Sequence, residues 1–485
     1  MTTVLWYRQD LRVSDHDALL DACGRGPVVP VFVWHPEGEG RWPLGGAQRW
    51  WLDRSLRALD AQLRERGSRL VVRAGDPAAE LAQVAAASGA RRVVCSRRYE
   101  PDAMREEERV ADALEAQGLG LERIGSTLLF DPFEIRSGSG TPYKVFTPFW
   151  KACMARPEPD RPRPAPAAIP APAAWPTCVS VDALRLNPTI AWDAGLRATW
   201  TPGEVAGRKR MAAFVAGPVG EYSDRRDIPS VDGTSRLAAY LHFGEVSPRE
   251  AWHAAGDAAR GRGAAFAGGV QKFRAELGWR DFGAHVLANF PRTSDDPLRT
   301  EYRRFPWRTD AAQLRAWQRG RTGYPFVDAG MRELWHTGTM HNRVRMVVAS
   351  FLTKHLRMDW MHGARWFWDT LVDADLGSNT LGWQWAGGCG ADAAPYFRIF
   401  NPVTQGEKFD AEGEYIRRWV PELAKVPSKY LHAPWEAPPL ALSMSGVTLG
   451  EDYPWPIVDH AKAREEALAA LSSISAKAGP AEAPD

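Results

Sequence analysis

Cysteine is scarce in this sequence, and its positions are far apart. The 485 residues include only Cys23, Cys95, Cys153, Cys178 and Cys389. An odd number at such distances fits neither a disulfide framework nor the close pairs that bind zinc or an iron–sulfur cluster. The sequence therefore predicts no metal site, and a reducing cytoplasm is the expected location.

Long hydrophobic runs and a strong net charge are lacking as well. No uncharged apolar stretch reaches about 18 residues, so no membrane span is predicted. Arg8 and Asp10 interrupt the first residues, which argues against a secretory signal peptide. The formal net charge is only +2, so bulk charge does not indicate a nucleic-acid binder. A site for a polyanion must come from local clusters of arginine.

The segment 1–130 lacks a G-x-G-x-x-G sequence after its first apolar run, which argues against a Rossmann dinucleotide site. The glycines of residues 38–46 have no such context and predict a surface loop rather than a phosphate-binding turn. Otherwise the segment alternates between strand and helix patterns, as α/β units do. Buried parallel strands are predicted at Thr3–Tyr7, Val28–Trp34, Leu70–Arg73 and Arg92–Cys95.

Helices are predicted between these strands. Ala47–Arg66 places four leucines on one face, and Gly67 is expected to end this helix. Asp76 followed by Pro77 is typical of an N-cap and a first helical residue. A third helix is expected over Asp102–Gln117. Residues 1–130 are therefore predicted to form a doubly wound α/β domain.

The second part of the chain has a different pattern. Residues Pro157–Pro176 hold eight prolines, which excludes a helix or central strand and predicts an extended linker, assigned to residues 131–200. Beyond residue 200 helical patterns dominate, for example in Ala311–Arg319, Tyr324–Thr337 and Arg343–Arg357. An all-α domain is predicted over residues 201–475, followed by a disordered tail over 476–485.

Tryptophan is abundant in this helical region. The chain has 22 tryptophans, and ten of them lie between Trp252 and Trp385. Most are expected to fill the core, because tryptophan buries a large apolar surface. Several stand beside polar motifs, so core filling alone does not account for them.

Two of these motifs could hold a ligand. Asp232–Leu237 (DGTSRL) offers backbone N–H groups, two hydroxyls and a cation to a phosphate, or an ordinary helix N-cap at one of its hydroxyl residues. Glu276, Trp279 and Arg280 fall at i, i+3 and i+4 and share a helix face. They suit a polar pocket for a heteroaromatic ligand, or equally a solvated ion pair beside a packed tryptophan.

A third motif lies on a helix that begins near His341. Asn342, Arg345 and Met346 share one face of this helix. An asparagine amide can bind the edge of a base or flavin, and methionine packs adaptably against a flat ring. His341 beside them is expected to be structural and has no assigned role.

The fourth motif, Asp373–Trp385, combines two carboxylates, an amide and two tryptophans. The Asp-x-Asp pair of Asp373 and Asp375 could bind a metal, but no third ligand is spaced to complete the site. An ion pair of Asp373 or Asp375 with Arg345 is the preferred interpretation.

These motifs occur together in one known family. The sequence resembles the cryptochrome/photolyase family over nearly its whole length. The resemblance rests on YRQDLRVSDH, YKVFTPFW, GTSRL, ELGWRDF, TGYPFVDAGMREL, MHNRVRM, DADLGSNTLGWQWAGG and APYFRIFNPVTQGEKFD, in this order. It implies an α/β domain, a long linker and a helical FAD-binding domain, which agrees with the patterns above.

The resemblance implies FAD as the cofactor, reduced and anionic in the active form. Asn379 corresponds to the residue beside flavin N5, where the side chain tunes the redox state. Trp383, Trp360 and Trp307 correspond to the chain that relays an electron from the surface to the excited flavin. The other implied FAD positions are Tyr222, Thr234, Ser235, Arg236, Leu237, Glu276, Arg280, Asn342, Arg345, Asp373 and Asp375.

The resemblance also implies light-driven repair of cyclobutane pyrimidine dimers in UV-damaged DNA, independent of sequence and by a monomer. A damaged pair stacks and pairs poorly, so flipping it out costs less than flipping normal bases. Glu276 would bind the edge of the dimer and stabilise its radical anion. The positions implied to line the dimer pocket are Glu276, Trp279, Asn342, Met346 and Trp385. Those near the backbone phosphates are Arg226, Arg343, Gln405 and Lys408.

Some residues depart from the family pattern, and the identity of the antenna chromophore has several alternatives. Thr339 stands where the family usually has tryptophan, and Tyr99–Ala103 lacks the Asn-Glu pair of some folate-binding members. The GADAAPYFRIFNP run and the helix start at Arg49–Leu52 resemble the photolyases closest to plant cryptochromes. Methenyltetrahydrofolate is the preferred antenna, with 8-hydroxydeazaflavin, a flavin or no antenna as alternatives.

Three other functions are alternatives to dimer repair. A (6-4) photolyase is disfavoured, because it would carry histidine where Asn342 and Met346 stand. A signalling cryptochrome usually has an extended C-terminal tail. A DASH-type enzyme acting on single strands is the third alternative.

Overall fold

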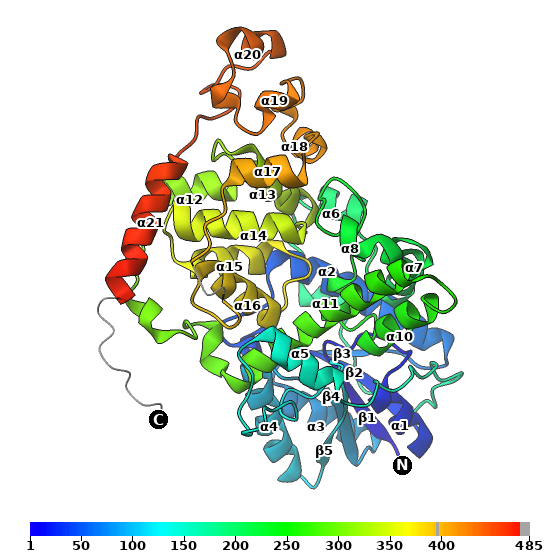
Figure 1. Ribbon diagram of the computed structural model, residues 1–485. Helices are drawn as coiled ribbons and strands as arrows, with labels where there is room; N and C mark the ends of the chain where they lie inside the picture. The colour runs from blue at the N-terminus through cyan, green and yellow to red at the C-terminus, as the bar shows by residue number, and fades with distance from the viewer. Residues whose placement is uncertain (394–396, 476–485) are drawn as a thin grey trace. The chain divides into compact units, whose positions relative to one another are not determined.

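The computed structural model describes residues 1–393 and 397–475 of the chain (Figure 1). These residues fall into two compact units. Unit 1 comprises Met1–Ser223, Thr234–Pro291 and Val372–Gly377. Unit 2 comprises Asp224–Gly233, Arg292–Leu371 and the described part of Ser378–Asp485. The tail expected over residues 476–485 lies outside the described residues.

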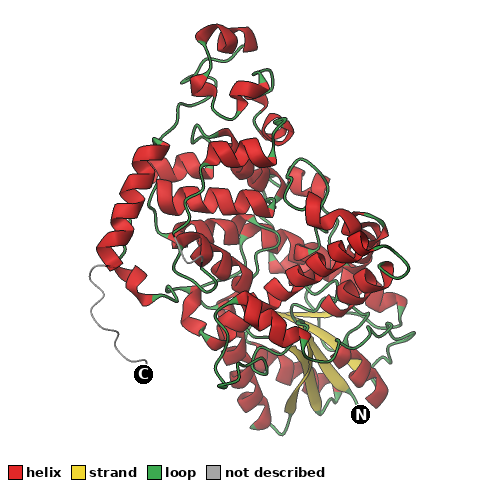
Figure 2. Ribbon diagram, in the orientation of Figure 1, coloured by secondary structure: helices red, strands yellow, loops and turns green. Residues whose placement is uncertain are grey.

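Unit 1 contains a five-stranded parallel sheet in the order β3-β2-β1-β4-β5, with helices packed around it (Figure 2). In β1, Thr3 pairs with Val28 of β2 on one side and with Arg92 of β4 on the other. The doubly wound α/β fold predicted from the sequence is therefore confirmed. The strands are β1 Thr3–Tyr7, β2 Val28–Trp34, β3 Val71–Ala74, β4 Arg92–Arg97 and β5 Gly120–Ser126.

The helices between the strands begin and end where the local residues require it. Asp76 caps α3 by accepting a hydrogen bond from Ala79 N at 3.2 Å, and Pro77 occupies its first position. Gly67, with φ +82°, follows the end of α2 in a conformation that favours glycine. The helices are α1 Asp17–Arg25, α2 Gly46–Glu65, α3 Pro77–Ser88 and α4 Pro101–Glu115.

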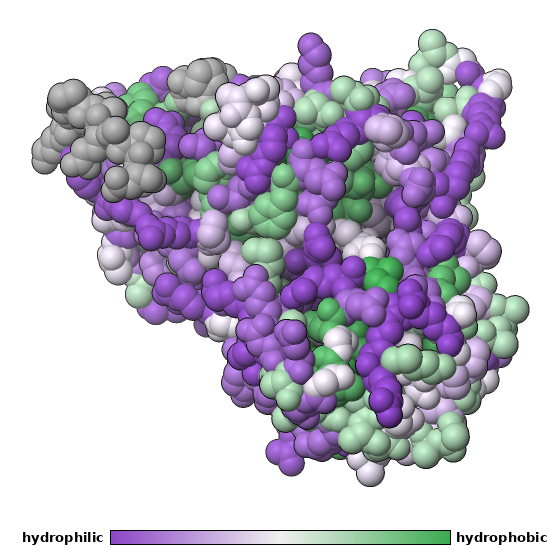
Figure 3. Space-filling view, turned by 90° about the horizontal axis from the view of Figure 1, so that it is seen from below, coloured by the Kyte–Doolittle hydropathy of each residue, from purple (hydrophilic) through white to green (hydrophobic). Residues whose placement is uncertain are grey.

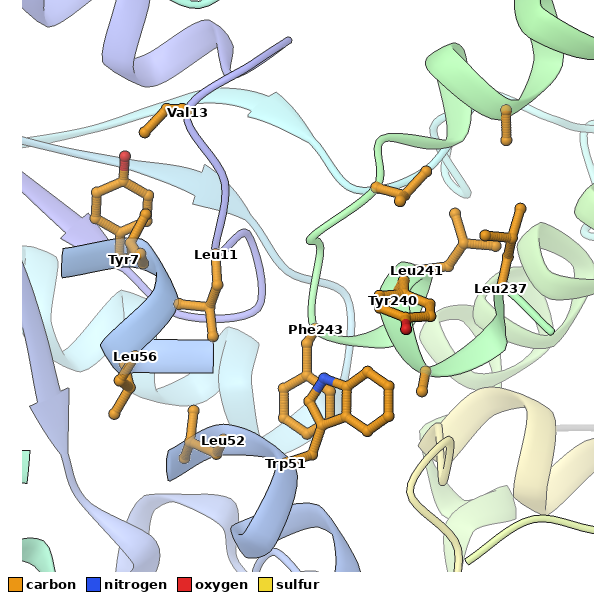
Figure 4. Close-up of a cluster of buried hydrophobic side chains, with 14 of the residues drawn as sticks. Tyr7, Leu11, Val13, Trp51, Leu52, Leu56, Leu237, Tyr240, Leu241 and Phe243 are labelled. Atoms are coloured by element: carbon orange, nitrogen blue, oxygen red, sulfur yellow. The ribbon is translucent and has the colours of Figure 1, made fainter. Parts of the chain in front are cut away.

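The core of unit 1 joins α2 to residues far along the chain (Figure 4). Trp51 stacks on Phe243 at 6.1 Å between ring centroids and meets Tyr240 edge-on at 5.0 Å. Trp51 Nε1 also donates to Glu245 Oε2 at 3.0 Å. Burial raises the pKa of Glu245 to about 8, so this carboxyl is a polar anchor inside an apolar core.

The predicted linker Pro157–Pro176 contains no helix or strand, and it is fastened to the surface of unit 1 by backbone hydrogen bonds. Asp15 N donates to Arg163 O at 2.8 Å, and Val28 N donates to Pro170 O at 2.8 Å. The prolines thus keep the segment extended while its carbonyl groups remain available as acceptors.

The remaining described secondary structure is helical, apart from an isolated bridge between Leu449 and Tyr453, and loops join the helices. Unit 1 continues with α5 Phe146–Met154, α6 Ala194–Thr199, α7 Glu204–Ala216, α9 Ala238–His242, α10 Pro248–Ala258 and α11 Ala264–Asn289. Unit 2 contains α12 Ala311–Gln318, α13 Pro325–Thr337, α14 Asn342–Ser350, α15 Trp360–Thr370, α17 Pro402–Phe409, α18 Glu414–Trp419, α19 Ser428–Leu431, α20 Pro439–Ser445 and α21 His460–Ser475. The chain passes from one unit to the other within α8 Tyr222–Arg225 and α16 Leu376–Gly387.

One predicted helix differs from the structure. The pattern over Arg343–Arg357 predicts a continuous α-helix, whereas α14 ends at Ser350 and a π-helical turn, η6 Phe351–His355, follows it. All side chains from Val347 to Leu356 are buried, so the hydrophobic pattern does not show where the α-helix changes to a π-turn.

The surface in Figure 3 is mainly hydrophilic, with hydrophobic side chains in small groups. Within residues 1–393 and 397–475, no helix has the length and apolar character needed to cross a membrane. The same residues contain no group of three or more His, Cys, Asp or Glu side chains arranged to hold a metal ion.

Candidate functional site

In unit 1, the predicted phosphate-binding segment is held by an arginine that no sequence motif indicates. Arg210 donates to Thr234 O and Ser235 O, both at 2.9 Å. Arg236 has a left-handed backbone, with φ +53°. The N-cap of α9 is Leu237 without a side-chain cap, so the alternative of an ordinary cap at Thr234 or Ser235 is not formed. Arg210 thus binds the two carbonyl groups of the segment. The groups that remain for a ligand are mainly hydroxyl and N–H donors.

Arg280 on α11 is fixed by backbone acceptors. Its guanidinium donates to Thr127 O at 2.7 Å and to Leu241 O at 3.3 Å. The next residue, Asp281, accepts hydrogen bonds from Leu129 N and Phe130 N at 2.8 and 3.0 Å. Burial raises the pKa of Asp281 to about 7. These contacts place a cation with a defined orientation beside the end of α9.

Glu276 and Trp279 lie on the same helix, α11. Trp279 stacks on Phe146 with 3.8 Å between ring centroids and 10° between planes, and it remains partly exposed. Glu276 Oε1 lies 4.0 Å from Lys272 Nζ. The helix therefore presents an aromatic ring, braced by a second ring, one turn away from a carboxylate.

Asp373 and Asp375 belong to unit 1 and are partly buried. Between them, Ala374 O accepts a hydrogen bond from Gln48 Nε2 at 2.7 Å. His242 Nδ1 lies 3.8 Å from Asp375 Oδ2. Arg345 belongs to unit 2, and each unit is described by itself. The ion pair predicted between Arg345 and one of these carboxylates therefore stays a prediction.

Tyr222 is buried in unit 1. Its ring contacts Phe214 and Phe273 edge-on, at 5.6 and 5.9 Å between centroids. These two phenylalanines fix the position of the tyrosine ring.

In unit 2, α14 carries the third predicted motif. His341 caps the helix by accepting from Arg343 N at 3.2 Å, and burial lowers its pKa to about 4. It is thus a neutral structural residue. Asn342 is exposed and Met346 is partly exposed. Arg345 donates to Met340 O at 2.7 Å and to the Thr339 hydroxyl at 3.4 Å. Thr339, which stands where the family usually has tryptophan, thus binds an arginine that is predicted to contact FAD.

A cluster of cations surrounds two residues that no sequence motif assigns to the site, Asp227 and Phe409. Arg343 Nη2 donates to Asp227 Oδ2 at 2.8 Å, and its guanidinium lies over the Phe409 ring at 4.4 Å. Lys408 Nζ lies over the same ring at 5.2 Å, and Arg226 Nε lies 3.8 Å from Asp227 Oδ1. Asp227 directly follows Arg226, and Phe409 directly follows Lys408. Their position next to predicted residues is therefore the sequence feature that could have indicated them.

Gln405 and Trp385 are partly exposed in unit 2. Gln405 lies on α17, one turn before the end of the helix where Lys408 stands. Trp385, on α16, lies 6.3 Å from Phe400 between ring centroids.

Asn379 and the three predicted relay tryptophans also belong to unit 2. Asn379 is buried, and its Nδ2 donates to Ala364 O at 3.0 Å. Trp383 and Trp360 are 2% and 3% exposed, whereas Trp307 is partly exposed. Trp383 and Trp360 are thus both buried, and Trp307 is the one of the three that reaches solvent.

Trp383 has close aromatic neighbours. Its ring meets Phe367 at 4.9 Å and Trp317 at 6.1 Å between centroids. A Cβ atom at Gly363 would lie 2.0 Å from the Trp383 ring, so only glycine allows this approach. Trp317 is fully buried, and no sequence pattern distinguishes it from other core tryptophans.

Two known protein families match most of the chain. The DNA photolyase family matches residues 3–171, and the FAD binding domain of DNA photolyase matches residues 273–473. The chain is 46% identical over 473 residues to a deoxyribodipyrimidine photo-lyase of Agrobacterium fabrum, covering 97% of this chain and 98% of the relative. The chain belongs to the cryptochrome/photolyase family.

Other members of the family are also similar. Cryptochrome-1 of Arabidopsis thaliana is 39% identical over 98% of this chain and 71% of its own length. The crystal structure of a bacterial class III photolyase from Agrobacterium tumefaciens has a TM-score of 0.94 and 45% identity, covering 98% of each chain. A cryptochrome of Synechocystis has a TM-score of 0.87 and 28% identity, covering 96% of this chain and 98% of its own. The chain is thus an enzyme of the DNA photolyase type with a FAD-binding domain.

The described residues fit FAD. Thr234 and Ser235 supply hydroxyls on a segment whose carbonyls are bound to Arg210, and Arg280 supplies a cation. These donors suit a diphosphate. In unit 2 the buried amide of Asn379, held by its bond to Ala364, has the polar character needed at a flavin ring edge.

Proposed function

We propose that this protein repairs cyclobutane pyrimidine dimers in DNA under light. The observation that carries the proposal is the arrangement on α11, where Trp279 is braced by Phe146 at 3.8 Å and stands one turn from Glu276. A flat, partly exposed ring beside a carboxylate suits a flipped-out pyrimidine dimer, which needs both stacking and an edge contact. The full-length similarity to deoxyribodipyrimidine photo-lyases supports the same function.

Each pocket residue has a role in this proposal. Trp279 and Trp385 stack on the dimer, and Glu276 binds its edge and stabilises the negative charge that it acquires. Asn342 binds the edge of a base, and Met346 packs against its face. An asparagine and a methionine at these two positions favour cyclobutane dimers over (6-4) products.

We propose that FAD is held by the positions named from the sequence. Thr234, Ser235, Arg236 and Leu237 bind its phosphates with hydroxyl and N–H groups. Reduced FAD, when bound and excited by light, supplies the electron that opens the cyclobutane ring and takes it back afterwards. The remaining positions are Tyr222, Glu276, Arg280, Asn342, Arg345, Asp373, Asp375 and Asn379.

Asn379 and the three tryptophans control the redox state of the cofactor in this proposal. The amide of Asn379 is oriented by its bond to Ala364, which supports a fixed contact of its oxygen with the flavin in this proposal. Trp383, Trp360 and Trp307 relay an electron inward, because an indole is easily oxidised and an aliphatic side chain is not. The partial exposure of Trp307, beside the burial of the other two, supports this direction.

Four side chains bind the DNA backbone in this proposal. Arg226, Arg343, Gln405 and Lys408 contact phosphates near the lesion, which positions the duplex without reading its sequence. Their clustering around Phe409 and Asp227 supports a common binding surface for the three cations.

We also propose methenyltetrahydrofolate as an antenna, with 8-hydroxydeazaflavin, a flavin or no antenna as alternatives. A photolyase from Sulfolobus tokodaii, 28% identical to this chain, has a crystal structure with two FAD molecules, which keeps a flavin antenna among the alternatives. An absorption spectrum of the purified protein separates these cases. A strong near-ultraviolet or violet band beyond the flavin bands supports a folate or deazaflavin antenna, and flavin bands alone count against both.

The repair function is tested by illuminating the purified, reduced protein with an oligonucleotide that contains a thymine dimer. The absorbance of intact thymines is expected to return under blue light and to stay absent in the dark. A dimer that persists under blue light while FAD stays reduced rejects the proposal. That result would favour a signalling cryptochrome, the alternative supported by the similarity to Arabidopsis cryptochrome-1.

A further inference from the structure

Arg343, one of the proposed phosphate ligands, is already bound to a carboxylate in unit 2. Its Nη2 donates to Asp227 Oδ2 at 2.8 Å, and its Nη1 lies 3.9 Å from Met346 Sδ. The Phe409 ring covers the guanidinium plane at 4.4 Å. In the free protein, the position of Arg343 is therefore fixed and its charge is compensated.

The carboxylate also stands next to a second proposed phosphate ligand. Arg226 Nε lies 3.8 Å from Asp227 Oδ1, so one negative charge adjoins two of the three cations of this surface. A carboxylate at a DNA-binding surface repels the phosphates that the surface must attract. Its presence there calls for a function other than affinity.

The ion pair is of a kind that a phosphate can replace. The Asp227 side chain is 37% exposed and that of Arg343 is 19% exposed, so solvent weakens their attraction. Only one nitrogen of the arginine fork is engaged by the carboxylate, whereas a phosphate can be bound by two. The contact is thus strong enough to orient Arg343 and weak enough to be exchanged.

We propose that Asp227 competes with the DNA backbone for Arg343 and keeps this cation neutralised until a phosphate displaces the carboxylate. On an undamaged duplex Arg343 stays paired with Asp227 and adds little to binding. Flipping out a dimer deforms the backbone, and a phosphate near the lesion then takes the place of the carboxylate. This inference rests on the proposed DNA-repair function, and it limits the contribution of Arg343 to the binding of undamaged DNA.

An alternative role makes the opposite prediction. If Asp227 only orients Arg343 for its phosphate, its removal weakens binding to the lesion and leaves undamaged DNA unaffected. If Asp227 competes with phosphate, its removal strengthens binding to undamaged DNA.

The test uses Asp227→Asn in the full chain, with two duplexes that differ only by one thymine dimer, in the dark. Asp224→Asn is the matched control, because it removes the same charge from an exposed carboxylate three residues earlier. Relative to this control, Asp227→Asn is expected to bind undamaged DNA about threefold more tightly at about 50 mM salt. Because one added phosphate contact steepens the salt slope by about 0.9, this gain should vanish towards about 200 mM. Affinity for the lesion duplex should rise at least as much, because the Arg343–Asp227 pair no longer has to be broken there.

A second variant ties the effect to Arg343. In an Arg343→Ala background, Asp227→Asn is expected to give no further gain on undamaged DNA, as a double-mutant cycle requires for a direct pair. An equal gain in both backgrounds rejects the proposal, and so does an undamaged-DNA affinity that matches the control. If the wild-type protein itself does not favour the lesion, the proposed function fails and this inference fails with it. If the wild type favours the lesion and Asp227→Asn binds both duplexes no more tightly than the control, this inference alone is rejected.

Discussion

At the scale of residues, the interior of unit 2 shows how a small residue and a large one are matched. The Trp383 ring occupies space that even a methyl group at Gly363 would fill, because a Cβ atom there would lie 2.0 Å from it. The sequence predicts a role for Trp383 through the family resemblance, but it gives no sign of this dependence on Gly363. Such a dependence arises from packing between α15 and α16, which no local pattern encodes.

Replacement of Trp383 by phenylalanine is expected to block photoreduction of oxidised FAD. Phenylalanine keeps an aromatic ring in the site but is much harder to oxidise than indole. Repair should remain when FAD is reduced chemically before illumination. Flavin absorbance under blue light measures the first effect and thymine-dimer repair measures the second.

Trp317→Phe is the control for this variant, because Trp317 contacts the Trp383 ring at 6.1 Å but is not assigned to the relay. It should photoreduce normally. Normal photoreduction in Trp383→Phe would remove Trp383 from the relay.

Replacement of Glu276 by alanine is expected to lower the repair yield per absorbed photon severalfold, with a smaller loss of binding to lesion DNA. The carboxylate is assigned to the dimer during charge transfer, whereas stacking by Trp279 supports binding. Glu276→Gln keeps a hydrogen-bonding side chain and should lose less. A yield unchanged in the alanine variant would contradict this role.

At the scale of elements, the sequence predicts best where a segment is buried on both sides. The limits of β1 and β2 agree with the predicted strands, because continuous apolar runs mark strands covered on both faces. The apolar pattern does not predict β5 Gly120–Ser126, since this strand lies at the edge of the sheet and only partly buries its residues. Edge strands carry charged residues such as Glu122 and Arg123, which hide the strand pattern.

The anchoring of residues 129–130 to α11 predicts a pH effect. Asp281 accepts hydrogen bonds from Leu129 N and Phe130 N, and burial raises its pKa to about 7. A carboxyl whose folded pKa is raised stabilises the fold most at a pH below its unfolded pKa of about 4. That contribution is lost as the pH rises from about 4 through about 7.

Asp281→Asn keeps an oxygen acceptor for both N–H groups but does not titrate. The stability of this variant relative to the wild type is therefore expected to increase between about pH 4 and pH 7, by a few kcal/mol at most. Urea unfolding at several pH values measures the difference. A difference that is constant with pH would show that Asp281 keeps an ordinary pKa in the fold.

At the scale of the whole molecule, the candidate sites combine segments that are distant in sequence. Gln48 donates to Ala374 O across 326 residues at 2.7 Å, and Arg210 fixes the carbonyls of Thr234 and Ser235. The family resemblance names the residues proposed to contact ligands. The supporting residues Gln48, Arg210 and Asp227 could not be named, because their roles depend on three-dimensional contacts rather than on spacing.

The nearly balanced charge of the chain leads to a prediction about DNA binding. With a net charge of +2, attraction to DNA must come from the local cations Arg226, Arg343 and Lys408. Three phosphate contacts predict that the logarithm of lesion affinity falls with the logarithm of salt concentration with a slope of about −2.7. Lys408→Ala should reduce the magnitude of this slope by about 0.9, because one contact is lost. Lys425→Ala removes the same charge from an exposed position outside this cluster and should leave the slope unchanged. Titrations at several salt concentrations decide the matter: equal slopes for the two variants would show that Lys408 makes no phosphate contact and acts only through the overall charge.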